Sequence, residues 1–303
     1  MHERTQLTAI FCLSLAIFFL CIIAFAYNHQ VTHYLGNDYF PPNALIVGVL
    51  LLLMHQGCDI IFGKNTQVTM MLQDIMLLYL VMSIIALATN AVQYTPFAPI
   101  DQALINWQDG LIWDNPALLN WISQYPQLYQ LLSFIYDSLN TQMTILPLCL
   151  ILSGKTKLFR EYSILLLLTC LLGFSFYYFF PTIAPASMLN NVYFTPEQHA
   201  TGIKFYQIHQ GSVPTTSDGG LIAFPSFHVI WAWLCVRITR EWPRLYLVMA
   251  LFNLVLCFSC VVLGWHYPID VIGSLVCMVI AHAVHRALMT PSRHLYLFSG
   301  IRV

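Results

Sequence analysis

Two short segments carry side chains suited to nucleophilic and acid–base chemistry. The first is Pro225-Ser226-Phe227-His228, and the second, about 40 residues later, runs from Gly264 to Asp270. His266 and Asp270 are four residues apart, so a helix that begins between them can bring the carboxylate to one imidazole nitrogen. The other nitrogen of that ring then becomes a stronger nucleophile, and His228 can protonate a leaving oxygen. The spacing therefore indicates a nucleophile oriented by an acid, with a second histidine as general acid.

Prolines predict that both segments open helices. Pro225 and Pro268 each fit the first turn of a helix, where the missing backbone donor costs nothing. The first-turn amides of two such helices, together with the Ser226 hydroxyl, can donate to an anion such as phosphate. Alternatively, both histidines merely cap helices or lie at the headgroup level of a membrane, as polar residues often do. Two histidine segments at matched positions, one with an acid four residues on, favour the chemical role.

The elements that must position these residues are membrane helices. The chain has 303 residues, of which 58% are hydrophobic and only 8% are charged. This composition excludes a soluble enzyme, a disordered chain and a coiled coil. The net charge of −1 gives no field that suggests nucleic acid as a partner. All nine cysteines fall in apolar runs, which predicts neither a disulfide framework nor a zinc site.

Eight apolar runs approach the roughly 20 residues that a transmembrane helix needs. They begin near Leu7, Asn43, Met70, Gln130, Tyr162, Ala223, Leu245 and Pro268. This pattern predicts an all-α fold, a polytopic membrane helix bundle of about eight transmembrane helices. The first run has an alternative interpretation as a secretory signal, because Ala24-Phe25-Ala26 looks like a cleavage site.

The basic residues predict the orientation of the bundle. With the amino terminus in the cytoplasm, the twelve Lys and Arg residues all fall on the cytoplasmic side except Lys204. Both termini are then cytoplasmic, and both histidine segments lie at the external face. His282 and His285 near the end of the last span are explained by the helix dipole, so no metal site is predicted.

Two long external segments are expected, at residues 94–129 and 181–221. In the first, apolar residues recur at helical spacing and predict a short interfacial helix: Ile100, Ala103, Leu104, Trp107 and Leu111. The second holds several prolines and a Ser/Thr/Gly/Asp cluster, which predict a loop. Lys204 lies in this loop and is a candidate phosphate ligand, although a lone loop lysine is usually solvated.

The two histidine segments resemble the second and third motifs of the type-2 phosphatidic acid phosphatase superfamily. This resemblance implies a six-helix catalytic core, here residues 67–290, and a phosphohistidine mechanism. It makes His266 the nucleophile, Asp270 its orienting acid and His228 the leaving-group acid, with no metal or other cofactor. Residues 1–66 would form a two-helix extension, and residues 291–303 a cytoplasmic tail.

Within the superfamily the resemblance is closest to the branch that includes the inositol phosphorylceramide synthases. Three features carry it: Phe227 where the phosphatases have Gly, the segment from Phe180 to Pro185 in place of a basic first motif, and Pro99-Ile100-Asp101. Superfamily phosphatases also have an Arg six residues before the nucleophile, where this chain has Cys260. The phosphate site is therefore expected to be largely neutral.

The predicted function is that of an integral-membrane lipid phosphotransferase or phosphatase at the external face, inositolphosphotransferase-like, with a phospholipid or sphingolipid as substrate. A plain phosphatidic acid or isoprenoid (di)phosphate phosphatase is the alternative. A transporter is the second class, because acids inside spans often mark pathways: Asp59, Asp74 and Asp137. Asp59 and Asp74 are expected to be wetted near the cytoplasmic ends of their spans, and Asp137 to support the site. The lipid headgroup, the acceptor and the oligomeric state remain open.

Overall fold

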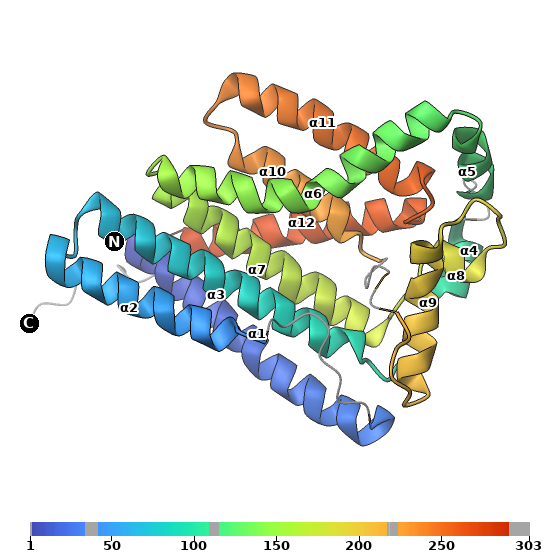
Figure 1. The fold of residues 1–303 in the computed structure, drawn as a ribbon, viewed down its shortest axis with the longest axis horizontal. Helices are drawn as coiled ribbons and strands as arrows, with labels where there is room; N and C mark the ends of the chain where they lie inside the picture. The colour runs from blue at the N-terminus through green and yellow to red at the C-terminus, as the bar shows by residue number, and fades with distance from the viewer. Residues whose placement is uncertain (1, 34–41, 109–114, 217, 219–223, 291–303) are drawn as a thin grey trace, which may run out of the picture.

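The computed structural model describes residues 2–33, 42–108, 115–216, 218 and 224–290. These residues form twelve helices and no strand (Figure 1). The chain is thus an all-α polytopic membrane bundle, as predicted. The helices are α1 (His2–Thr32), α2 (Ala44–Phe62), α3 (Gln67–Gln93), α4 (Asp101–Gln108), α5 (Asn115–Ser123), α6 (Pro126–Leu152), α7 (Thr156–Phe179), α8 (Pro185–Met188), α9 (Pro196–His209), α10 (Phe227–Ile238), α11 (Pro243–Val262) and α12 (Pro268–Met289).

Six of these helices are long and apolar enough to cross a membrane by length and composition: α1, α2, α3, α7, α11 and α12. The two other predicted spans correspond to α6 and α10. Helix α6 has 27 residues but carries Asp137, Asn140 and Gln142 among its apolar side chains. Helix α10 has only 12 residues, or about 18 Å, which is shorter than a hydrocarbon core of about 30 Å.

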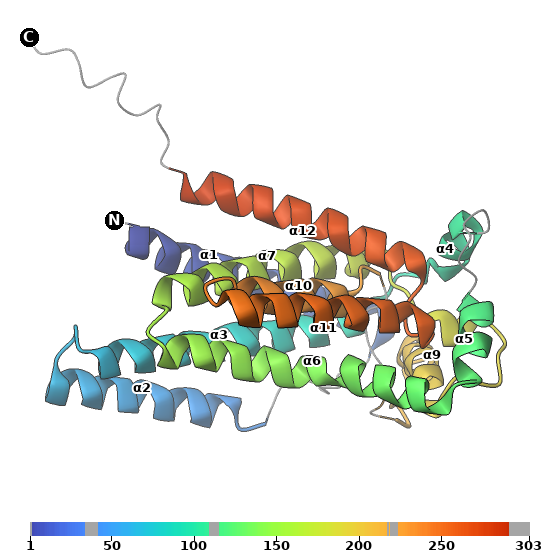
Figure 2. The same ribbon diagram turned by 90° about the horizontal axis from the view of Figure 1, so that it is seen from above.

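Helix α7 lies at the centre of the bundle. It packs against α1 and α3 on one side and against α6, α10 and α12 on others. Leu165, Leu166 and Leu167, three consecutive residues, are all fully buried. A helix that is apolar on every face is stable only when other helices surround it. Helix α2, in contrast, packs on α3 at the outer edge of the bundle (Figure 2).

The two ends of the bundle differ in charge and in structure. The start of α1 and the end of α12 lie at one end (Figures 1 and 2). Ion pairs join helices there: Glu161 pairs with Arg237 at 2.5 Å and with Arg240 at 2.6 Å. Arg160 lies 3.4 Å from Asp74, and both side chains are buried. The expectation that Asp74 is wetted was therefore wrong. Its carboxylate is buried and has Arg160 as the charged partner that a buried carboxylate needs.

The other end carries the short helices α4, α5, α8 and α9 (Figure 1). The short helix predicted in this segment is present as α4, with Leu104 buried and Trp107 exposed, and its place at the membrane interface stays a prediction. Leu111, which was assigned to the same helix, lies outside the described residues. A second short helix, α5, follows within the same segment.

The interpretation of residues 181–221 as a loop was wrong, because the segment contains α8 and the 14-residue helix α9. Thr195 caps α9: its hydroxyl accepts from Gln198 N at 3.4 Å, and Gln198 Oε1 accepts from Thr195 N at 2.8 Å. Pro196 occupies the first turn. This capping box is a helix-start signal that the sequence itself carries, from Thr195 to Gln198. Residues 217 and 219–221 of this segment lie outside the described residues.

Candidate active site

The starts of α10 and α12 are joined by hydrogen bonds. The Ser274 hydroxyl lies 2.9 Å from the carbonyl oxygen of Ser226 and 2.7 Å from that of Asp270. Ser226 N also donates to the Asp270 carbonyl oxygen at 3.4 Å. These contacts hold the first turns of two helices together, although about 40 residues separate them in the sequence.

The two prolines play different roles. Pro268 occupies the first position of α12, as predicted. Pro225 does not lie in the first turn of α10, because Ser226 is the capping residue and the helix begins at Phe227. The Ser226 hydroxyl accepts from Val229 N at 3.4 Å, and this bond defines where the helix begins. The prediction for Pro225 was therefore wrong by two positions.

A tight turn delivers His266 to the start of α12. Gly264 adopts a positive φ of 80°, and a Cβ atom there would lie 2.7 Å from the Phe194 ring, so both the conformation and the space require glycine. His266 N donates to the Cys260 carbonyl oxygen at 3.0 Å. The Asn115 amide donates to the His266 carbonyl oxygen at 2.9 Å. The backbone of His266 is thus held from both sides.

The predicted contact between His266 and Asp270 is present. His266 Nδ1 lies 3.2 Å from Asp270 Oδ2, and the two side chains are 4% and 0% exposed. The same carboxylate oxygen accepts from Tyr267 N at 2.8 Å, and Asp270 N donates to the Tyr267 carbonyl oxygen at 3.0 Å, so the start of α12 is bonded in both directions. This geometry favours the tautomer that carries the proton on Nδ1 and directs the lone pair of Nε2 away from Asp270.

His228 lies beside His266, with 5.7 Å between the ring centroids. It is half-buried, and its ring stacks on Tyr136 of α6 at 4.1 Å. Tyr136 in turn stacks on Trp265, at 5.3 Å and an interplanar angle of 8°. The Tyr136 hydroxyl also lies 3.4 Å from His228 Nδ1. These contacts fix the plane of the His228 ring while the side chain keeps some exposure.

Asp101, at the first position of α4, joins this helix to the histidine segment. Its Oδ1 accepts from the Tyr267 hydroxyl at 3.2 Å, and its Oδ2 accepts from Ile183 N at 2.9 Å. Burial and then the nearby charge of Asp270 raise the pKa of Asp101 to about 7, against the lowering effect of the Ile183 hydrogen bond. Asp101 therefore links three segments that are distant in sequence.

Of the other residues predicted at the site, Ser226 and Lys204 are buried and Asp137 is exposed. Ser226 is fully buried, and its hydroxyl oxygen accepts the capping hydrogen bond at the start of α10, so its observed role is structural. Lys204 was expected in a loop as a candidate phosphate ligand; it lies instead in α9 and is only 3% exposed, and its role as a ligand stays a prediction. Asp137 is exposed on α6, whereas its neighbour Tyr136 faces His228.

Asn115 was missed in the sequence, because it carries no motif and its partner lies 151 positions away. Tyr136, the neighbour of Asp137 in the stretch that was expected to support the site, contacts His228 across 92 positions. The hydrogen bond between Tyr267 and Asp101 spans 166 positions. Tyr267 and Asp101 each stood inside a segment singled out by the resemblance, which was the only signal available for them.

Comparison with known proteins gives one match. A family model described as the PAP2 superfamily matches residues 102–284, which extend from α4 into α12 and include both histidine segments. No curated protein and no solved structure is significantly similar to the chain.

Proposed function

The chain belongs to the PAP2 superfamily, and on this basis we propose that it transfers the phosphate group of a membrane lipid through a covalent intermediate on His266. As a type-2 phosphatidic acid phosphatase superfamily member with membrane-spanning helices, it is a membrane phosphoric ester hydrolase or phosphotransferase. The substrate class, the face of the membrane and the catalytic residues are the parts that we propose.

The observation that carries the proposal is the contact of His266 with Asp270 beside His228. The 3.2 Å contact orients one imidazole, and the second ring lies 5.7 Å away, centroid to centroid. A phosphorus atom placed between the two rings can be approached by one histidine while its leaving oxygen faces the other. The starts of α10 and α12 meet at the same place, where Ser226 N donates to the Asp270 carbonyl oxygen.

The proposed reaction has two displacements. In the first, His266 Nε2 attacks phosphorus, the bond from phosphorus to the lipid oxygen breaks, and protonated His228 gives its proton to that oxygen. In the second, neutral His228 removes a proton from water or an alcohol, whose oxygen attacks phosphorus and displaces His266. Asp270 stabilises the positive charge that His266 carries in the intermediate. Each histidine then returns to its starting state.

The preferred substrate that we propose is a phosphodiester lipid. A phosphate monoester carries nearly two negative charges at neutral pH, and proteins usually bind it with Arg or Lys. At the position of the superfamily Arg, this chain has Cys260, which is fully buried, with its carbonyl bound to His266 N. Lys204 is buried in α9, at the same end of the bundle as the histidines. A single negative charge is the better match for such a site.

Transfer to an alcohol, as in inositolphosphotransferases, follows from the same argument and is our preferred reaction. Hydrolysis of phosphatidic acid or of an isoprenoid (di)phosphate is the alternative. A transporter has less support, because Asp74, one of the acids that suggested it, is paired with Arg160.

We further propose that the histidine end of the bundle faces the external side of the membrane and that both termini are cytoplasmic. The end with the start of α1 and the end of α12 also carries the arginines of α7 and α10. Lys204 lies at the other end, in α9. This distribution supports the positive-inside orientation. We retain residues 67–290 as the proposed catalytic core and 1–66 as an extension; 291–303 lie outside the described residues.

The test of the function uses purified protein and a panel of phosphatidic acid, phosphatidylinositol, phosphatidylethanolamine and phosphatidylglycerol, with and without an added alcohol. His266→Ala should abolish turnover and remove the acid-labile phosphoenzyme trapped by rapid quench. His29→Ala, which changes an exposed histidine at the same end of the bundle, is the matched control. Full turnover by folded His266→Ala protein would contradict the proposal.

A further inference from the structure

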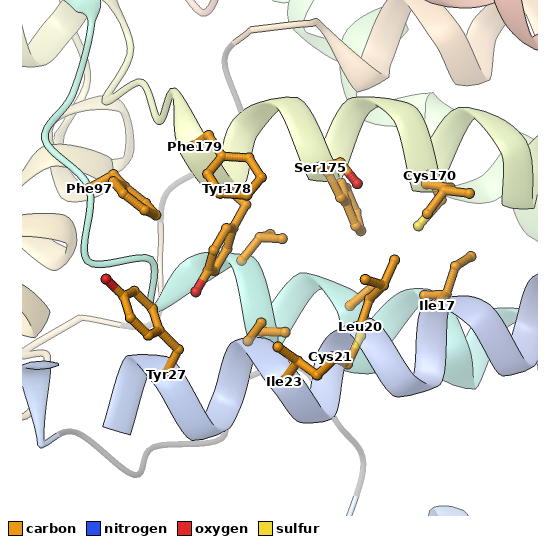
Figure 3. A pocket seen from close by; sticks show the side chains of 16 residues that line it. Ile17, Leu20, Cys21, Ile23, Tyr27, Phe97, Cys170, Ser175, Tyr178 and Phe179 are labelled. Atoms are coloured by element: carbon orange, nitrogen blue, oxygen red, sulfur yellow. The ribbon is translucent and has the colours of Figure 1, made fainter. Parts of the chain in front are cut away.

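An apolar groove lies between α1, α3 and α7, apart from the histidine site. Its volume is about 460 Å³, within the range of ligand sites in proteins. Figure 3 shows its walls, with Tyr27 on α1 and Tyr178 on α7 at one end and Ile17 and Cys170 at the other. Helices α1 and α3 lie outside residues 102–284, so two of the three walls come from outside the part of the chain that matches the superfamily.

Small side chains keep this groove open. Cys21, Ala88, Ala91 and Cys170 line it and are each at most 4% exposed, so they form its floor. Leu20, Ile23, Tyr27 and Phe179 also line it but are about half exposed, which places them on the rim. No helix covers the rim of the groove among the described residues, so the groove is open on the outer surface of the bundle, where lipid would lie.

The polar atoms of the lining gather toward one end. The hydroxyls of Tyr27 and Tyr178 lie at that end, beside Phe97 (Figure 3). The Phe97 ring is 6.4 Å from Tyr27 and 5.8 Å from Tyr178. Tyrosines of this kind are typical of the membrane–water interface. The remaining lining is apolar apart from Ser175 and two cysteines, so the groove runs from an interface into the hydrocarbon region.

The length of the groove matches one leaflet. The ten steps along α1 from Ile17 to Tyr27 rise about 15 Å, which is about half of a hydrocarbon core of roughly 30 Å. The end with Tyr27 is the end of the bundle that carries the histidines. The groove therefore occupies the leaflet from which the active site would take its substrate.

One side chain connects the groove to the active site. Phe174 of α7 lines the groove, and its ring lies 4.7 Å from that of Phe227, the residue before His228. Phe227 packs closely on α7, because a Cβ atom on Gly173 would lie 2.7 Å from its ring. An acyl chain in the groove would thus be separated from the start of α10 by the rings of Phe174 and Phe227.

We propose that the groove between α1, α3 and α7 binds one acyl chain of the substrate lipid and so positions its phosphate at His266. This inference rests on the proposed function, because it assigns the tail of the substrate of the same site. The open apolar lining, the length of one leaflet and the contact through Phe174 and Phe227 all fit a hydrocarbon chain with its headgroup at the histidine end. Since the surrounding lipid is equally apolar, the groove contributes orientation more than affinity.

The first test fills the groove. Ala88→Leu adds a bulky side chain on its floor, and Ala86→Leu is the matched control, two residues away on the same helix and not part of the lining. Turnover is measured for dihexanoyl and dioleoyl forms of each lipid in the panel. We expect Ala88→Leu to lower the ratio of kcat/KM for the long-chain form to that for the short-chain form by about fivefold or more. An unchanged ratio in folded, active protein would overturn the proposal.

The second test does not depend on activity. A phosphatidylinositol with a diazirine at mid-chain is photolysed on the purified protein, and labelled peptides are identified by mass spectrometry. We expect labelling at Leu20 or Ile23, reduced severalfold in Ala24→Phe and retained in Ala26→Phe, an exposed residue outside the lining. Competition by unlabelled phosphatidylinositol but not by phosphatidylcholine supports a substrate chain. Equal competition means that bulk lipid fills the groove, and it overturns the proposal.

The two proposals fail in different ways. If no lipid in the panel is turned over and no phosphoenzyme forms, the proposed function fails, whatever the labelling shows. If wild-type protein is active but Ala88→Leu keeps the chain-length ratio and Ala24→Phe keeps the labelling, only the groove proposal fails. Thermal unfolding of each variant separates a filled groove from a misfolded protein.

Discussion

The Tyr267 hydroxyl donates to Asp101 Oδ1 at 3.2 Å, and this bond joins the residue after His266 to the first residue of α4. The other oxygen of Asp101 accepts from Ile183 N. One buried carboxylate therefore links three segments: the turn that carries His266, the start of α4 and the segment before α8. Burial, together with the charges of Asp101 and Asp270, raises the pKa of Tyr267 above its usual value, so the phenol remains a donor.

The first prediction concerns this bond. Tyr267→Phe leaves Asp101 Oδ1 buried without its donor, at a cost of about 1–3 kcal/mol in the free energy of unfolding. We expect a lower melting temperature and a kcat lowered about tenfold with little change in KM, because the turn that carries His266 is less well held. Tyr193→Phe, at a tyrosine that is 48% exposed, is the control. An unchanged melting temperature in Tyr267→Phe would mean that the bond contributes nothing.

The second prediction concerns pH. The pKa of Asp101 is raised to about 7 in the folded chain, from an ordinary value of about 3.9. Its neutral form is therefore favoured by folding, and its contribution to stability is full below about pH 4 and is lost as pH rises toward 7. Relative to Asp101→Asn, the wild type should lose stability between about pH 4 and 7. Melting temperatures of both proteins across this range check the sign, with Asp218→Asn, at an exposed position, as the control.

The third prediction concerns the orienting acid. Asp270→Asn retains the size of the side chain but removes the charge that favours the Nδ1-protonated tautomer of His266. By analogy with other acid-oriented histidines, kcat should fall about 10³- to 10⁴-fold. Single-turnover kinetics should show slower formation of the phosphoenzyme. Asp137→Asn, at an exposed carboxylate on α6, should behave like the wild type. A similar loss in both variants would argue for a general effect of charge and against orientation by Asp270.

The fourth prediction separates the two enzyme alternatives. Because Cys260 replaces the superfamily Arg and is fully buried, a singly charged phosphodiester should be preferred to a monoester. We expect kcat/KM to be higher for phosphatidylinositol than for phosphatidic acid in the same detergent, and transfer to an added alcohol to compete with hydrolysis. A clear preference for phosphatidic acid would establish the plain phosphatase alternative instead.

The fifth prediction concerns orientation. Reporter fusions after Arg160 and at the carboxyl terminus should be cytoplasmic, and a fusion after Lys204 should be external. The start of α7, which carries Arg160, and the helix α9, which carries Lys204, lie at opposite ends of the bundle (Figure 1), so the two fusions report on opposite sides of the membrane. An external signal after Arg160 would reverse the orientation and place the histidines on the cytoplasmic side.

The sequence alone was sufficient for features that depend on composition or on neighbouring residues. A chain that is 58% hydrophobic and 8% charged has to bury its backbone polar groups in helices within a bilayer, so the all-α membrane bundle was predictable. The contact of His266 with Asp270 was also predictable from neighbouring residues, because a helix that begins between them, here at Pro268, brings the carboxylate back to the imidazole.

Only the tertiary structure decided the features that depend on packing between distant segments. Tyr136 stacks on His228 from 92 positions away, and Asp101 binds Tyr267 from 166 positions away. Lys204 is buried because α9 forms and packs against α8, whereas an isolated loop lysine would be solvated. The groove exists because α1 and α3 meet α7 along small side chains. No local pattern encodes these contacts, because each forms only after the helices have packed.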